Sequence, residues 1–254
     1  MTFASGILTE TKRDIISFSH VHKAFEFPVL VDCSFNLGAT ESLAILGSKG
    51  SGKSLVLRLI MGFELPDQGE VRTVGVIPAL PESRDDVRDR VQMVSQSGMV
   101  LENLTMFENT YFDLSKSIRE LEDVQQSLIV EGLLDMAALR EKKTELPASL
   151  PLAGRRMLAL VSALGKEPDC VLFDEPTAEL HPILSDDLTH LIRKLKTQLR
   201  LAYVIATNDL DLTREVADKV LFLQHRNVSF FGSTAEFFQS HDPNIQRYIA
   251  MGST

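Results

Sequence analysis

Apolar and polar residues alternate in the first part of the chain, in a way that predicts strands. In residues 14–18 and 29–37 the alternation runs roughly at every second position, as it does in half-buried strands. Residues 41–46 form a short apolar run that ends at Gly47, and this pattern indicates a buried strand. Residues 1–45 are therefore predicted to be rich in strands.

The spacing of apolar residues then becomes helical. Residues 54–61 form a predicted helix, closed by Gly62. Residues 66–92 hold many prolines, glycines and charged residues, so we predict turns and short strands there. Residues 105–165 are rich in Leu, Glu, Lys and Gln at helical spacing. This last block is predicted to be a helical insertion.

Strand and helix patterns alternate again in the remainder of the chain. Strands are predicted at 170–173 and 202–206, and helices at 182–199 and 212–217, while the runs 220–223 and 228–231 indicate a hairpin. Strands that alternate with helices imply an α/β fold with a parallel core. No internal repeat or flexible linker interrupts the pattern, and 254 residues suffice for one large domain or for a domain with a subdomain.

A glycine-rich loop lies between the buried strand and the first helix. Residues 47–54, Gly-Ser-Lys-Gly-Ser-Gly-Lys-Ser, match the pattern G-x-x-x-x-G-K-[ST] completely. Glycines allow successive backbone N–H groups to turn toward phosphate oxygens, and a helix N-terminus adds positive potential. Lys53 would reach the β and γ phosphates, and the Ser54 hydroxyl would hold Mg²⁺. A plain glycine turn is the alternative, but the full match in this context favours nucleotide binding. Lys49 is an extra cation, either solvated or part of the phosphate field.

Two acids follow the predicted strand 170–173. Asp174 stands at the strand end, where a carboxylate can coordinate Mg²⁺, and Glu175 is placed where it could polarise an attacking water. A solvated turn is the alternative, and it would be preferred for these residues alone. About 120 residues after a phosphate loop, the functional interpretation is favoured.

Composition narrows the choice of ligands and location. The net charge of −9 argues against general nucleic-acid binding, which needs a cationic face. No apolar run approaches the roughly 20 residues of a membrane helix, and residues 1–6 lack the charged and apolar regions of a signal peptide. Cys33 and Cys170 have no metal-site spacing. We therefore expect a cytosolic protein with reduced thiols.

With these motifs, the sequence resembles the nucleotide-binding subunit of an ABC transporter over residues 14–250. The resemblance implies an α/β P-loop NTPase core with a mixed sheet, an antiparallel β subdomain, a helical subdomain at about 105–165 and a C-terminal tail at 232–254. It also implies ATP and Mg²⁺ as cofactors. The implied nucleotide contacts are Phe25 and the loop residues Gly47, Ser48, Lys49, Gly50, Ser51, Gly52, Lys53, Ser54 and Leu55.

The resemblance implies roles for further residues. Gln96 matches the family's Q-loop glutamine, which touches Mg²⁺ or water and senses the membrane partner, so the implied metal set is Ser54, Gln96 and Asp174. The implied catalytic set is Glu175, Asn208 and Gln96. Phe25 occupies the position of the aromatic that stacks on adenine, with core packing as an equally weighted alternative.

Some stretches are similar to the Mla-type ATPases, which serve lipid-transport systems with MCE-domain proteins. These stretches are 97–101, 104–109, 174–178 and 232–248. The similarity implies phospholipid or lipid transport, with an Mla-type permease and an MCE-domain protein as partners. Contact with the membrane is expected through the partner alone, on the inner face of the cytoplasmic membrane.

Three family elements are altered. The signature L-S-G-G falls on Leu150-Pro151-Leu152-Ala153, where Pro151 lacks both hydroxyl and N–H. Arg155 and Arg156 could supply compensating charge, but an exposed helix face is the preferred interpretation. Asn208 replaces the switch histidine; asparagine donates hydrogen bonds but cannot become cationic. His181 replaces the D-loop aspartate, and we interpret it as a loop histidine near an interface.

These departures affect hydrolysis more than binding, because a lost donor at the transferring phosphoryl group costs roughly 10²–10³ in rate. We expect a transporter ATPase that binds nucleotide and hydrolyses it slowly as a homodimer. The alternative is a degenerate subunit with a regulatory or structural role, paired with a competent ABC subunit. A soluble ABC protein without a permease would need a coiled coil, zinc cysteines or a second cassette, which the sequence lacks.

Overall fold

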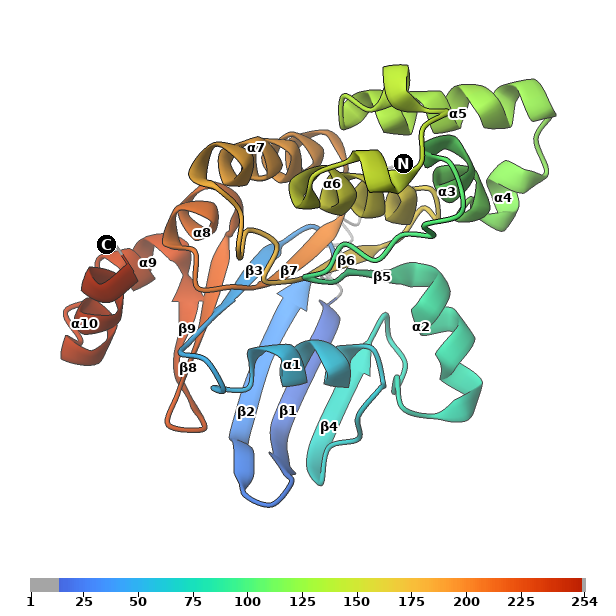
Figure 1. Ribbon diagram of the computed structural model, residues 1–254. Helices are drawn as coiled ribbons and strands as arrows, with labels where there is room; N and C mark the ends of the chain where they lie inside the picture. The colour runs from blue at the N-terminus through green and yellow to red at the C-terminus, as the bar shows by residue number, and fades with distance from the viewer. Residues whose placement is uncertain (1–13, 253–254) are drawn as a thin grey trace, which may run out of the picture.

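Two β-sheets and an inserted group of helices make up the computed structural model, which describes residues 14–252 (Figure 1). The residues predicted for strands before position 14, the leader expectation for 1–6, and the tail residues Ser253 and Thr254 lie outside this range. Within the described part, none of the helices combines the length and apolar character that crossing a membrane requires.

The larger sheet has six strands in the order β5-β6-β7-β3-β8-β9. All neighbouring pairs are parallel except β8 and β9, which form the predicted antiparallel hairpin. The parallel strands are short and apolar, and β3 and β7 are buried at every position, as expected for a sheet covered on both faces. The bounds are β3 Ser42–Leu46, β5 Val91–Val94, β6 Cys170–Asp174, β7 Ala202–Ala206, β8 Lys219–Gln224 and β9 Asn227–Ser233.

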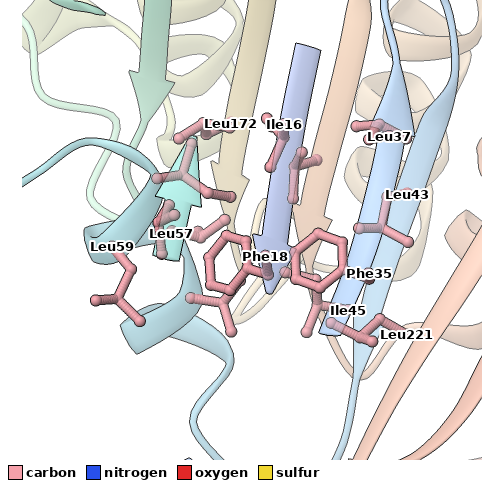
Figure 2. Close-up of a cluster of buried hydrophobic side chains, with 14 of the residues drawn as sticks. Ile16, Phe18, Phe35, Leu37, Leu43, Ile45, Leu57, Leu59, Leu172 and Leu221 are labelled. Atoms are coloured by element: carbon pink, nitrogen blue, oxygen red, sulfur yellow. The ribbon is translucent and has the colours of Figure 1, made fainter. Parts of the chain in front are cut away.

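The smaller sheet is antiparallel, with the order β2-β1-β4, where β1 is Asp14–Ala24, β2 Pro28–Gly38 and β4 Gln68–Thr73. The helix that follows the glycine-rich loop, α1 (Lys53–Ile60), packs against strands of both sheets. Its apolar side chains join those of the two sheets in one buried cluster (Figure 2). In that cluster the rings of Phe18 and Phe35 stack with centroids 4.5 Å apart. The cluster fixes the start of α1, and with it the loop, relative to the strand ends.

The segment 66–92 contains a helix that sequence reasoning missed. We predicted turns and short strands, and β4 and β5 are present, but α2 spans Arg84–Arg90. Of its seven residues only Val87 is buried, so the segment has no apolar stripe that could reveal a helix. Asp85 and Asp86 in its first turn and Arg88 and Arg90 in its last complement the helix dipole.

The predicted helical insertion is confirmed. It contains α3 Met106–Phe112, α4 Lys116–Arg119, α5 Asp123–Met136 and α6 Leu152–Leu164. A capping box begins α3, with the Thr105 hydroxyl accepting from the Glu108 N–H and the Glu108 carboxylate accepting from the Thr105 N–H. The apolar faces of these helices pack with β6 and β7 in a second buried cluster. The insertion is therefore continuous with the core at α6.

Four helices follow in the last part of the chain: α7 Pro182–Gln198, α8 Leu210–Val216, α9 Thr234–Phe238 and α10 Pro243–Gly252. The predicted 182–199 and 212–217 helices correspond to α7 and α8. The described part of the tail starts in the last residues of β9 and continues with α9 and α10, which lie beside β8 and β9 (Figure 1). A third cluster, which includes Phe222, Phe237 and Ile245, packs these helices against the sheet.

Candidate functional site

Four neighbouring parallel strands end at one edge of the larger sheet, and the segments that follow them carry the predicted site residues. The glycine-rich loop follows β3, Gln96 follows β5, Glu175 follows β6 and Asn208 follows β7. Open α/β sheets bind ligands at this carboxyl edge. Topology thus brings together residues that lie up to about 160 positions apart in the sequence.

Backbone geometry at the glycine-rich loop requires glycine at two positions. Gly47 has a φ of 152°, and a Cβ there would lie 2.5 Å from the Leu223 carbonyl oxygen. Gly52 has a φ of 106° and stands directly before α1, where the phosphate-binding turn becomes a helix. The Ser51 hydroxyl oxygen is buried and has no hydrogen-bond partner within the described residues. An unpaired buried hydroxyl beside a helix N-terminus fits a phosphate oxygen as its missing partner.

Lys53 lies at the centre of the site and is 6% exposed. Its Nζ donates to the Gly47 carbonyl oxygen at 2.8 Å and to Asn208 Oδ1 at 3.1 Å. The same Nζ lies 3.2 Å from Glu175 Oε1, an ion pair that is largely shielded from water. A buried ammonium needs such partners, because an unpaired buried charge is costly. These three contacts fix the position of the Lys53 ammonium group beside the glycine-rich loop.

Ser54 and Asp174 form the predicted metal pair. The Ser54 hydroxyl donates to Asp174 Oδ1 at 2.9 Å, although the two residues are 120 positions apart. A hydroxyl and one carboxylate at this spacing fit Mg²⁺, which binds through few protein oxygens and completes its shell with water and phosphate oxygens. Gln96, the third predicted metal residue, lines the same cleft, but its amide donates to Glu179 Oε1 at 3.2 Å, and among the described residues no hydrogen bond joins it to either member of the pair.

Glu175 holds a left-handed backbone conformation, with a φ of 49°, directly after β6. Its N–H donates to the Ala206 carbonyl oxygen at 2.8 Å, which ties the residue to the end of β7. A non-glycine residue in this region costs about 1–3 kcal/mol, which the surrounding contacts have to offset. The turn directs the carboxylate toward Lys53 and toward Asn208, whose Nδ2 donates to Glu175 Oε1 at 3.3 Å.

A cleft of about 510 Å³ joins most of these groups. Val29 and Ala178, which sequence reasoning did not select, also line it. Gly47, Ser48 and Ser51 belong to the loop without lining the cleft. The predicted residues that line the cleft are Lys49, Gly50, Gly52, Lys53, Ser54, Leu55, Gln96, Asp174, Glu175 and Asn208.

Phe25 lies outside the cleft lining, at the tip of the β1–β2 hairpin. It is 61% exposed, so the core-packing interpretation is wrong. The hairpin is nonetheless adjacent to the loop, since Val29 lines the cleft and a Cβ on Gly52 would lie 3.4 Å from Val29 Cγ1. Lys23 Nζ lies 5.4 Å from the centroid of the Phe25 ring, within the range of a cation–π contact.

Arg156 corrects a second expectation. We interpreted it as part of an exposed helix face, but it is 1% exposed. Its guanidinium donates to the carbonyl oxygens of Gln96, Pro176 and Ala178 at 2.6–2.7 Å, and burial lowers its pKa. The residue therefore links the segment after β5 to the segment after β6. Arg155 is half-buried and pairs with Glu102 at 2.8 Å.

The altered signature begins a helix without a side-chain cap. Pro151 is the N-cap residue of α6, and its φ of −64° and ψ of 167° are those of an ordinary N-cap. Leu150 and Ala153 are buried, so this stretch also serves the packing of the insertion. His181 is exposed directly before α7, as expected for a loop histidine.

Comparison with known proteins agrees with this geometry. The family described as ABC transporter matches residues 30–178. The sulfate/thiosulfate import ATP-binding protein CysA 1 of Chromobacterium violaceum is 34% identical over 227 residues, which cover 88% of this chain and 62% of that protein. The chain thus spans less than two thirds of that relative. The thiamine import ATP-binding protein ThiQ of Mesorhizobium japonicum is 33% identical, with 93% of this chain and 89% of that protein covered.

Solved structures show the same fold. The structure of cbiO1 from Clostridium perfringens, part of the ABC transporter complex cbiONQ, has a TM-score of 0.80 at 20% identity, and the match covers 94% of this chain and 95% of that one. A dimeric ATP-binding cassette in a post-hydrolysis state, bound to ADP and Pi, has a TM-score of 0.74 at 21% identity over 86% of this chain and 98% of that one. The chain therefore belongs to the ABC transporter family and has the fold of its ATPase domain, whose cofactors are ATP and Mg²⁺.

Proposed function

We propose that this chain is the ATP-binding subunit of an ABC transporter, and that it couples binding and hydrolysis of Mg-ATP to transport through a partner permease. The observation that carries the proposal is the meeting of Lys53, the Ser54–Asp174 pair and Glu175 at one edge of the sheet. A structural turn has no need for a buried lysine, a strained glutamate and an unpaired serine hydroxyl in one place.

The residues divide the chemistry between binding and water activation. The N–H groups of the loop and Lys53 would hold the phosphates, with Ser54 and Asp174 as the protein oxygens for Mg²⁺. When bound, the metal ion neutralises negative charge on the phosphate oxygens. Glu175 would accept a proton from the attacking water, and the Asn208 amide would donate to a phosphate oxygen. The Lys53–Glu175 ion pair has to loosen as Lys53 turns to the phosphates, which frees the carboxylate for this role.

Hydrolysis is proposed to be slow for the chain alone. In the family arrangement that the resemblance implies, the segment at Pro151 approaches the nucleotide of the other subunit, and here Pro151 itself offers neither a hydroxyl nor an N–H. Binding depends instead on the phosphate loop and the Ser54–Asp174 pair, which are intact. Tight binding with low turnover is therefore the expected combination.

We expect Pro151→Ser to raise the steady-state turnover several-fold. The residue already has N-cap dihedrals, so serine would fit without a backbone change and add a hydroxyl at the start of α6. The same hydroxyl should stabilise the fold by about 1 kcal/mol through capping. Thermal unfolding separates the two effects, because a higher melting temperature with unchanged turnover would show a cap and no contribution to catalysis.

We expect Phe25→Ala to weaken ATP binding by about 10-fold. This loss corresponds to the lower part of the range of about 1–3 kcal/mol for one base stacked on an aromatic ring. Stability should change little, since the side chain is 61% exposed. Phe27→Ala is the matched control, because Phe27 is 68% exposed at the same hairpin tip. Calorimetric titration with Mg-ATP measures both, and equal affinities for the two variants would remove Phe25 from the nucleotide site.

The substrate and the partner are the finer part of the proposal. Lipid transport with an Mla-type permease and an MCE-domain protein has its support in the short stretches at 97–101 and 104–109. The relatives are named for import of sulfate or thiosulfate, thiamine and methionine. Co-purification with the products of neighbouring genes decides between them: an MCE-domain protein supports lipid, and a solute-import permease overturns it. In both cases we expect the chain at the cytoplasmic face of the membrane, held by its partner.

The test of the proposed function is calorimetric titration of the chain with Mg-ATP, followed by phosphate release with and without the co-purified permease. Binding with turnover that the permease raises supports the proposal. Absence of binding overturns it.

A degenerate subunit is the second candidate, favoured by Pro151 and Leu152 in the signature. It would bind ATP, remain inactive alone and with its permease, and gain turnover only when mixed with a second ABC subunit. A homodimer that hydrolyses ATP excludes this candidate.

A further inference from the structure

Tyr248 reaches the proposed site from α10, about 200 positions after the glycine-rich loop. Its hydroxyl oxygen accepts from the Gly47 N–H at 3.2 Å, and its hydroxyl donates to Asn208 Oδ1 at 3.1 Å. The residue thus contacts both the first position of the loop and the segment after β7. It ends the stretch 232–248 that is similar to the Mla-type ATPases, but that similarity implies no role for it.

The directions of these hydrogen bonds follow from donor and acceptor chemistry. A backbone N–H can only donate, so the phenol oxygen must accept from Gly47 and keeps its own proton for Asn208. An ammonium can also only donate, so Lys53 Nζ at 3.1 Å requires the oxygen of the Asn208 amide on its side. Two donors therefore converge on Asn208 Oδ1, and the NH₂ group is left to face Glu175 Oε1 at 3.3 Å.

The tyrosine is held in place by packing. Its ring lies 4.8 Å from the ring of Phe222 on β8, and Ile245, one turn earlier on α10, is 3% exposed. Burial raises the pKa of Tyr248 to about 12; the Gly47 hydrogen bond opposes this rise and the charge of Glu175 adds to it. The phenol therefore stays protonated, and able to donate, well above neutral pH.

Orientation matters more for asparagine than for most side chains, because the two ends of its amide have the same shape and opposite hydrogen-bonding character. A half-turn of the amide would point an oxygen at Glu175 and at any phosphate oxygen beside it. Acceptors would then face acceptors, and the site would lose the donor that Asn208 can offer.

We propose that Tyr248 is a positioning residue, whose hydroxyl locks the Asn208 amide with its NH₂ group toward Glu175 and the nucleotide. Through this contact the C-terminal helix α10 completes the proposed site. The inference rests on the proposed ATPase function for its kinetic consequence; the orientation of the amide stands on the hydrogen bonds alone.

Tyr248→Phe is the direct test, since it keeps the ring against Phe222 and removes only the hydroxyl. The change removes the hydrogen bonds to both Asn208 and Gly47. We expect the loss at Asn208 to lower kcat about 3- to 10-fold, the rate equivalent of one neutral hydrogen bond, with KM for ATP within twofold of the wild type. Tyr111→Phe is the matched control: Tyr111 is also half-buried, beside Phe107, and its hydroxyl has no hydrogen bond within the described residues. A structural loss would lower the melting temperature and change KM as well.

The variant Asn208→Ala supplies the second arm. If Tyr248 acts through Asn208, then Tyr248→Phe should have no further effect on kcat in an Asn208→Ala background. An equal fall in both backgrounds, or an unchanged kcat in Tyr248→Phe, would overturn the proposal.

A spectroscopic arm needs neither nucleotide nor turnover. The side-chain NH₂ signals of Asn208 in a ¹⁵N–¹H correlation spectrum can be assigned by their loss in Asn208→Ala. We expect Tyr248→Phe to shift these signals and Tyr111→Phe to leave them in place. Unmoved signals overturn the positioning role. Absent ATP turnover in the wild type, together with shifted signals, would instead overturn the proposed function and leave the contact intact.

Discussion

Lys53→Ala is expected to weaken Mg-ATP binding by about 10²-fold. The lysine is the one side chain of the loop that is both buried and cationic, and a hydrogen bond to a charged group is worth about 1.5–3 kcal/mol, at the upper end where water is excluded. Lys53 is 6% exposed and already oriented by the Gly47 carbonyl oxygen and Asn208, so its loss removes a preformed contact. Calorimetric titration of the purified variant measures the change.

Lys49→Ala is the matched control for this experiment. Lys49 lies in the same loop and lines the same cleft, but it is exposed to solvent. We expect a change of less than about threefold, because exposed charges are screened by water and salt. Unchanged binding in Lys53→Ala would remove the phosphate-loop assignment. Equal losses in both variants would show that only the net charge of the loop matters.

The sequence could predict those parts of the site whose function depends on residues that are close together in the chain. The eight residues from Gly47 to Ser54 match a pattern whose geometry is set by their own backbone, and an apolar strand ending in Asp174 and Glu175 has a similar local logic. The parallel core could be predicted for the same reason, since short apolar strands between helices leave few other topologies.

The residues that sequence reasoning missed or misread depend on contacts between distant segments. An arginine in a predicted helix is usually exposed, and only the fold shows that three carbonyl oxygens converge on the Arg156 guanidinium. Nothing in the sequence assigns a role to Tyr248, and only the placement of α10 brings it beside Gly47 and Asn208. The helix α2 was missed for a different reason: its single buried residue, Val87, gives no periodic pattern of apolar positions.

Arg156 and Tyr248 suggest how a site with altered family elements keeps its shape. Arg156 on α6 fixes the segments that carry Gln96 and Ala178, while Tyr248 on α10 fixes Gly47 and Asn208. Arg156 joins the segments that follow β5 and β6, and Tyr248 joins the segments that follow β3 and β7. Arg156 acts on backbone carbonyl oxygens, and Tyr248 acts on one backbone N–H and one side-chain amide.

Glu175→Gln is expected to lower kcat by about 10²–10⁴, the range for removing a general base, while Mg-ATP binding stays within a few-fold of the wild type or becomes tighter. Glutamine keeps the shape of the side chain and one oxygen for Lys53 and Asn208, but it cannot accept a proton from water. Loss of the negative charge 3.2 Å from Lys53 Nζ also frees the lysine for the phosphates. The measurement pairs steady-state phosphate release with calorimetric titration on the same sample.

Glu70→Gln serves as the control, because Glu70 is exposed on β4 and pairs only with Arg72 among the described residues. Turnover of Glu175→Gln equal to that of Glu70→Gln would mean that another group activates the water, and Glu175 would then lose the role of general base.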